Sequence, residues 1–269
     1  MTWLDYDFMR RALLAAFVIG LIAPAIGVFL VQRRLALLGD GMGHVALTGV
    51  GLAFLTGTAP VPTALAVAVV GAIGIEVLRA RSRSAGDVIL ALVFYGGIAG
   101  GVLLTYLAGN RAASSLNQFL FGAITTVSAA DLVWLVASAV LALITLAIFG
   151  REMFAVSFDA EVAHTQGIPV RFISILITVL AAVTVVIGMR TVGLLLVSAI
   201  MIVPIAAAQQ ISNSFRTTAM IGAGIGAACA VGGVITSYYV DAPSGATIVL
   251  LTLACFILAL GLGGIRGRR

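Results

Sequence analysis

The sequence is poor in charge and has no lysine. Only 9% of its 269 residues are charged, and all 15 basic residues are arginine. Soluble domains carry roughly a quarter charged residues. With 62% hydrophobic residues and a mean hydropathy of +1.21, the chain has too few polar groups to cover a surface that faces water. This composition excludes a soluble globular domain and indicates a protein whose solvent is lipid.

Several functional classes are also excluded by what is missing. Cys229 and Cys255 both lie in apolar runs, which predicts inert core thiols and no disulfide framework. The sequence has no G-x-x-x-x-G-K-[ST] motif, so this chain cannot hydrolyse ATP by that route. Residues 1–7 are acidic where a signal peptide would be basic, so the first apolar run is expected to be a retained span.

Continuous apolar runs of about 20 residues divide the chain. In lipid, every backbone polar group needs a partner inside the protein, which leaves helices and closed barrels. Barrel strands alternate polar and apolar residues over ~10 positions, whereas runs of about 20 suit helices that cross ~30 Å of hydrocarbon. The sequence therefore predicts one all-α domain over residues 1–269, a polytopic bundle of eight to ten helical segments. Spans are expected at about 11–31, 40–57, 61–79, 87–108, 130–149, 170–189, 192–210, 217–237 and 245–264, with a short or re-entrant helix within 112–128.

The arginines predict the orientation. They form short clusters between apolar runs, as topology determinants do, and give no basic face for nucleic acid. Eleven fall on one side of the membrane under this scheme and four on the other. Arginine-rich loops face the cytoplasm, so we expect a multi-pass inner (plasma) membrane protein with a cytoplasmic C-terminus. The cytoplasmic set is Arg33, Arg34, Arg79, Arg81, Arg83, Arg151, Arg171, Arg216, Arg266, Arg268 and Arg269.

Glycine is abundant, with 31 copies, and is often spaced by three or four residues. Pairs such as Gly97 with Gly101, and Gly222 with Gly226, let helices approach closely. Ordinary packing within the chain explains most such pairs, and a dimer interface is the alternative for any one of them.

One pair of ionisable residues inside the spans points to chemistry, because such residues are costly in lipid. In Gly39-Asp40-Gly41-Met42-Gly43-His44, Asp40 and His44 are four residues apart and share one helix face. A carboxylate and an imidazole can together ligate one divalent transition metal ion. Alternatively, Asp40 is a helix N-cap and His44 is a packed histidine hydrogen-bonded to the backbone. Two ligands do not close a site, so the others must come from other helices, water or a second copy of the chain.

The remaining ionisable residues in the spans have structural interpretations. Glu76 is expected to snorkel or to pair with Arg79. Asp87 and Asp131 each lie at the start of a span, where a carboxylate interacts favourably with the positive N-terminal end of the helix dipole. Pro204 is expected to kink its span or to mark a break that lines a pathway. Pro204 and Asp87 are accordingly assigned a structural or gating role.

A polar segment predicts a short cytoplasmic helix over about residues 157–168. Ser157 or Asp159 can cap its start, Glu161 lies in its first turn, and Gly167 ends it. The helix is too short and too polar to span a membrane. It is either a connecting helix or a docking helix for a cytoplasmic partner.

In these features the sequence resembles the permease subunits of bacterial ABC importers for zinc, manganese and iron, over nearly its whole length. The order and spacing of the motifs carry the resemblance. They are Arg33 to Asp40 leading to His44 and Gly49, Asp87, the set Asp159, Ala163 and Gly167, Val192-Gly193 with Leu196 and Pro204, and Pro243-Ser244-Gly245.

The resemblance implies the passive membrane half of an ATP-driven importer. It implies a homodimer, two separate ATPase subunits docked on the segment that contains Asp159, Glu161, Ala163 and Gly167, and an extracytoplasmic metal-binding protein that delivers the ion. Asp40 and His44 match family positions thought to contact the metal, with Zn²⁺ favoured and Mn²⁺ or Fe²⁺ as alternatives. The metal is a substrate, and no cofactor is expected.

One departure bears on the metal. Zinc-type members often have a second His in the span after Asp87, where this chain has Phe94-Tyr95-Gly96-Gly97. The rival functions are an ion-coupled secondary transporter or channel, an intramembrane enzyme, and a membrane scaffold. The spans lack a nucleophile–base pair and a metalloprotease motif, which argues against the enzyme, and a scaffold would leave Asp40 and His44 unexplained.

Overall fold

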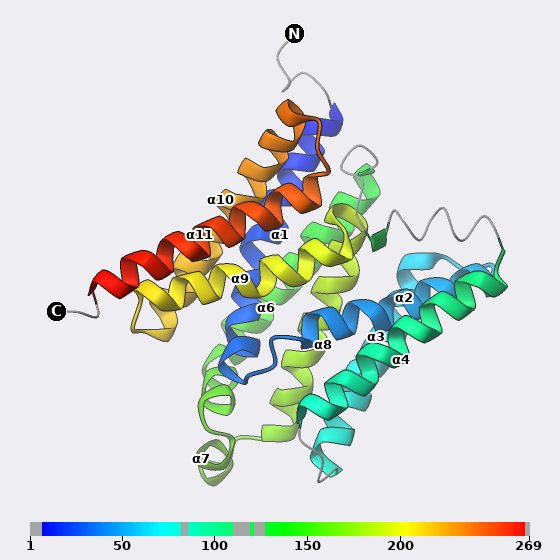
Figure 1. Cartoon of the computed structure of the whole chain (residues 1–269). Helices are drawn as coiled ribbons and strands as arrows, with labels where there is room; N and C mark the ends of the chain where they lie inside the picture. The colour runs from blue at the N-terminus through cyan, green and yellow to red at the C-terminus, as the bar shows by residue number, and fades with distance from the viewer. Residues whose placement is uncertain (1–6, 82–85, 110–118, 121–126, 267–269) are drawn as a thin grey trace.

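The computed structural model describes residues 7–81, 86–109, 119–120 and 127–266 (Figure 1). Every regular element within these ranges is helical, which confirms the predicted all-α bundle. The helices are α1 (Asp7–Gln32), α2 (Leu38–Thr56), α3 (Pro60–Arg81), α4 (Gly86–Leu107), α6 (Ala129–Phe158), α7 (Ala160–Thr165), α8 (Val170–Val192), α9 (Leu194–Ile211), α10 (Phe215–Val240) and α11 (Ser244–Arg266).

Eight of the helices in the described ranges are long and apolar enough to cross a membrane. The apolar part of α9, Leu196–Ile211, is shorter than the other spans. The sequence placed the division between α8 and α9 at residues 190–191. In the structure it falls slightly later, at Gly193, where φ is +92°, a conformation that glycine adopts without strain. The predicted helix within residues 112–128 lies largely outside the described residues.

Helices α1 and α8 form the centre of the bundle. In their most apolar stretches 67% and 72% of residues are buried, against 17% in α6 and in α11. Helix α8 packs against α1, α2, α3, α6 and α9, so it joins the α2–α3–α4 group to the remainder of the bundle (Figure 1). The outer helices leave their large apolar side chains exposed, as expected where the solvent is lipid.

The two glycine pairs pack within the chain. A Cβ on Gly226 would lie 2.6 Å from Cγ of Pro24 in α1, and one on Gly101 would lie 3.2 Å from Cβ of Leu47 in α2. Gly222 and Gly97 likewise face α9 and α2. Ordinary helix packing is therefore confirmed for both pairs.

The short helix predicted over residues 157–168 is shorter than expected, because α6 is longer. At 1.5 Å per residue a helix of 30 residues spans about 45 Å, more than the ~30 Å of hydrocarbon. Helix α6 therefore continues through Ser157, and α7 has only six residues. Of the two predicted caps, Asp159 is correct and Ser157 is wrong. No residue before Asp159 stops the helix, and Asp159 has the extended conformation of a cap, with φ −152°.

The structure also tests the predictions for Asp131, Pro204 and the two cysteines. Asp131 and Ser128 form a reciprocal capping box at the start of α6, and Asp131 also pairs with Arg190, with Oδ1 and Nε 2.6 Å apart. Helix α9 continues through Pro204, so the predicted break is absent there. The Sγ atoms of Cys229 and Cys255 lie 3.5 Å apart as free thiols.

Glu76 pairs with Arg79 as predicted, with Arg79 Nη1 donating to Oε1 at 3.1 Å. The expectation that Glu76 snorkels is wrong, because its side chain is only 6% exposed. Its other partners come from α8 and from the turn before α2, which are distant in sequence.

Candidate functional site

The site begins at the turn that leads into α2. Arg34 has a φ of +58°, and Leu35 and Leu38 are buried, so the chain reverses sharply against the core before the helix starts. Leu37 occupies the N-cap position and no side chain caps the helix. Asp40 lies in the first turn of α2, and the alternative that it is the N-cap is therefore wrong.

Asp40 and His44 come together on one face of α2 as predicted. His44 Nε2 lies 3.8 Å from Asp40 Oδ1, and the two side chains are 13% and 29% exposed. Within the described chain His44 Nδ1 is buried and has no hydrogen-bond partner. The alternative of a histidine hydrogen-bonded to the backbone is wrong in this structure. The pair presents one carboxylate and one imidazole inside a helix apolar enough to span a membrane.

Helix α4 forms the wall behind His44. The ring of Phe94 meets the imidazole edge to face, with centroids 4.7 Å apart. Thr48 Oγ1 donates to the carbonyl oxygen of Gly97 at 2.9 Å, which ties the two helices together. A Cβ on Gly97 would lie 2.7 Å from the carbonyl carbon of His44, so the backbones are in direct contact.

The roles of Phe94 and Thr48 were not predicted from the sequence. Phe94 belongs to the segment where zinc-type relatives were expected to have a second His, but nothing in the sequence indicates that this side chain faces His44. Thr48 lies one turn after His44 on α2, and this spacing was the available signal.

Helix α9 packs against a neighbouring face of α2. A Cβ on Gly39 would lie 3.5 Å from Sδ of Met201 and 3.9 Å from Oγ of Ser198. The Ser198 hydroxyl is buried and, among the described residues, has no hydrogen-bond partner. Neither residue was singled out by the sequence. Both place a polar or polarisable atom beside the turn that carries Asp40.

No group of three or more His, Cys, Asp and Glu side chains comes together in the described parts of the chain. The Asp40–His44 pair thus remains a two-ligand site within one copy. A divalent ion bound there would keep coordination positions for water or for other groups. Such a site can bind an ion without enclosing it.

The four residues predicted for partner docking have different positions in and around α7. Asp159 Oδ1 accepts from the backbone N–H groups of Glu161 and Val162, both at 3.0 Å, so it caps the helix. Ala163 is buried and anchors α7 on the core, and Gly167 leaves the helix with a φ of +80°. Glu161 is exposed and is free of the core. Their role in docking stays a prediction.

The two residues assigned to gating lie apart from α7. Asp87 falls in the first turn of α4, as predicted, but its side chain lies outside the described residues. Pro204 is buried within α9. A gating role for either residue stays a prediction.

The chain is similar to known membrane transport proteins over nearly its whole length. The model of the ABC 3 transport family matches residues 5–263. The chain is 30% identical to the manganese transport system membrane protein MntC of Listeria innocua, over 95% of this chain and 91% of that protein. It is 29% identical to the manganese import system permease protein ScaB of Streptococcus gordonii, over 95% and 91%. The structure of PsaBC from Streptococcus pneumoniae in complex with Fab superposes with a TM-score of 0.85, at 29% identity over 95% and 92%.

Proposed function

The chain belongs to the ABC 3 transport family, and we propose that it is the membrane-spanning permease subunit of an importer that moves a divalent transition metal ion into the cytoplasm. The observation that carries the metal assignment is the Asp40–His44 pair inside α2. The sequence has no P-loop, so the proposal assigns ATP hydrolysis to a separate subunit.

The pair suits transit better than storage. Structural zinc sites use four protein ligands and bind strongly enough to drive folding. Two ligands leave the ion partly hydrated, so it can enter and leave on the time scale of transport. In the proposal, Asp40 and His44 replace part of the hydration shell and make up for the low dielectric of the span.

The donor set suits Zn²⁺, Mn²⁺ and Fe²⁺ alike. The sequence favoured Zn²⁺, and that preference stays untested. The relatives named above are manganese transport proteins. Phe94, which contributes no ligand, faces His44 where a second histidine would have favoured zinc. We therefore place Mn²⁺ first and Zn²⁺ second as the substrate.

The proposal includes three partners and an alternating-access cycle. An ATPase subunit docks on α7, an extracytoplasmic metal-binding protein delivers the ion, and a second copy of the chain completes the permease. ATP binding moves α7, and the bundle switches from one opening to the other. The exposed Glu161 and the capped start of α7 at Asp159 support the docking part.

Uptake of Mn²⁺ into proteoliposomes that contain the complete importer tests the proposal. The variant Asp40→Ala/His44→Ala is expected to lose uptake while its abundance and ATPase binding are normal. Asp40→Asn/His44→Gln keeps the side-chain volumes and is expected to lose uptake as well. Thr56→Ala, at the other end of α2, is the matched control and is expected to transport normally.

Unchanged uptake in both double variants would refute the assignment of the site. Uptake by the wild-type chain that needs no ATP and no ATPase would instead support the ion-coupled transporter or channel. Competition by Zn²⁺ and Fe²⁺ in the same vesicles ranks the three metals.

A further inference from the structure

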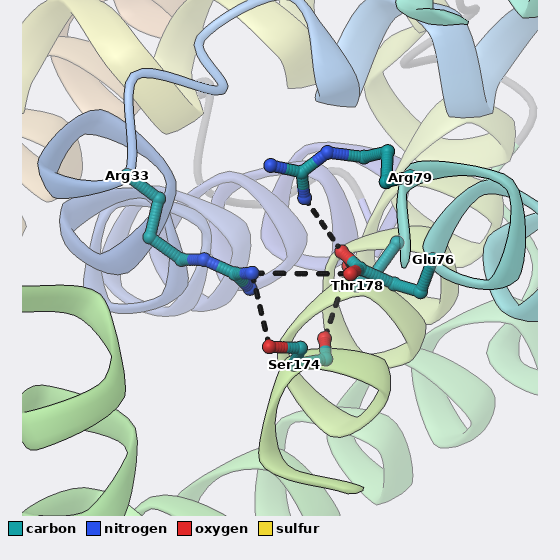
Figure 2. A network of polar contacts seen from close by, with 5 residues as sticks. All are labelled: Arg33, Glu76, Arg79, Ser174 and Thr178. Carbon is teal, nitrogen blue, oxygen red and sulfur yellow. Dashed lines mark hydrogen bonds and ion pairs between the residues drawn. The ribbon is translucent and has the colours of Figure 1, made fainter. Parts of the chain in front are cut away.

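A buried carboxylate joins three separate parts of the bundle near the cytoplasmic side. Figure 2 shows Arg33 and Arg79 converging on Glu76, with Thr178 and Ser174 of α8 beside it. Glu76 Oε1 accepts from Arg79 Nη1 at 3.1 Å and from Thr178 Oγ1 at 2.7 Å. Arg33 Nη2 lies 3.8 Å from Oε2 and donates to Ser174 Oγ at 3.0 Å. We call these five residues the Glu76 network.

The network is an expensive way to hold helices together. A buried ion pair loses hydration free energy that its Coulomb attraction often only balances, and apolar residues of similar volume frequently do as well. Burial lowers the pKa of the Arg33 guanidinium, and the nearby Glu76 carboxylate raises it. Stability alone therefore gives a weak reason for this arrangement. Directional contacts between charged groups do suit an element that must exchange partners.

At one end of the Glu76 network, Arg33 lies close in the chain to the start of α2. Arg33 belongs to the turn between α1 and α2, and the backbone N–H of Leu35 donates to the carbonyl of Leu30 at 2.8 Å. The backbone N–H of Leu38 donates to the carbonyl of Leu35 at 2.9 Å, so the turn is joined directly to the start of α2. A displacement of Arg33 is therefore carried directly into the first turn of α2, where Asp40 lies.

The other end of the network follows α7. Ser174 and Thr178 lie in the second and third turns of α8, which starts five residues after α7 ends. The buried Ala163 fixes α7 to the core, and its carbonyl accepts from the N–H of Ile168 at 3.1 Å. Force applied to α7 thus reaches the first turns of α8.

From this geometry we infer that Glu76 is a positioning residue that transmits movement of α7 to the Asp40–His44 pair, by linking α8 to the turn before α2. The inference rests on the proposed function. Among the described residues Arg33 Nη1 is buried without a hydrogen-bond partner, which gives Arg33 a spare donor for a second arrangement. In that arrangement Arg33 moves relative to Glu76 and carries the start of α2 with it.

The test uses the complete importer in proteoliposomes and measures Mn²⁺ transported per ATP hydrolysed. Glu76→Gln keeps the shape and one acceptor oxygen but removes the charge that holds Arg33. We expect the transport per ATP to fall by roughly fivefold or more, the lower end of usual coupling between sites. ATP hydrolysis and equilibrium Mn²⁺ binding to the purified complex are expected to stay at the wild-type level.

Two further variants keep the test decisive. Thr178→Val is nearly isosteric and removes the hydroxyl that donates to Glu76 of α3 and to the carbonyl of Ser174 within α8. It is expected to uncouple in the same direction if Glu76→Gln fails to assemble. Asp241→Asn, which removes an exposed carboxylate outside the network, is the matched control and is expected to couple normally.

Wild-type transport per ATP in Glu76→Gln, or in Thr178→Val, would overturn the inference. Loss of transport and ATP hydrolysis in equal proportion, together with lower thermal stability, would overturn it too, since that pattern belongs to a purely structural role. A wild-type complex without ATP-driven uptake of Mn²⁺, Zn²⁺ or Fe²⁺ would instead overturn the proposed function, and the inference with it.

Discussion

Gly97 offers the sharpest test of how α4 shapes the site. In Gly97→Ala the added Cβ would lie 2.7 Å from the carbonyl carbon of His44 and 2.8 Å from the backbone nitrogen of Val45. Carbon atoms in ordinary contact are ~3.5–4.0 Å apart, so the two helices have to separate by roughly 1 Å. The obstructing atoms are backbone, and they cannot rotate away.

The cost follows from this overlap. Overpacking of a core typically costs ~1–3 kcal/mol. Separation also stretches the hydrogen bond from Thr48 to the Gly97 carbonyl, which contributes about 1 kcal/mol. Phe94 moves away from His44 with the rest of α4. If about 1.4 kcal/mol of this cost is added to the free-energy barrier for passage of the metal ion, uptake slows roughly tenfold.

The assay is Mn²⁺ uptake by the complete importer, normalised to permease abundance, together with thermal unfolding in detergent. Gly96→Ala is the matched control, because Gly96 is exposed on the same helix and its added Cβ meets nothing within 4 Å. Equal uptake by the Gly97→Ala and Gly96→Ala variants would refute the reasoning. So would a variant that is less stable but transports normally per molecule, since α4 would then not position His44.

Two further predictions concern local structure. Asp159→Ala removes the cap of α7, worth about 1 kcal/mol, and is expected to weaken co-purification of the ATPase, whereas Asp159→Asn keeps an equivalent cap and the binding. Equal recovery of the ATPase with both variants would contradict a role for α7 in docking. Gly226→Ala is expected to lose ~1–3 kcal/mol of stability, because its Cβ would strike the backbone of α1, while Gly224→Ala has open space. Indistinguishable thermal unfolding of these two variants in detergent would show that α1 and α10 are not in such close contact.

Much of the fold could be predicted because a helix in lipid is recognised from the composition of its own segment. Each helix that spans a membrane must be apolar over its own length, so the runs in the sequence gave most helices to within a few residues. The cap at Asp159 was predictable for the same reason, and the division between α8 and α9 was predicted to within a few residues of Gly193, since both are decided by neighbouring residues. The end of α6 was not, because Arg151 and Glu152 mark the end of the apolar run, and nothing in residues 150–158 indicates that the helix continues beyond it.

In the site, too, the sequence predicted contacts between residues close in the chain and did not predict contacts between helices. Asp40 and His44 share a helix turn, so their spacing alone placed them together. The partners of that turn depend on contacts between helices, and in lipid these arise from shape and close packing, which leave no hydrophobic pattern in the sequence. Phe94 therefore could not be assigned to the imidazole of His44. For Glu76 the sequence determined the pairing with Arg79 three residues away. Only the tertiary structure brought in Thr178, 102 residues further along the chain, and buried the carboxylate between helices.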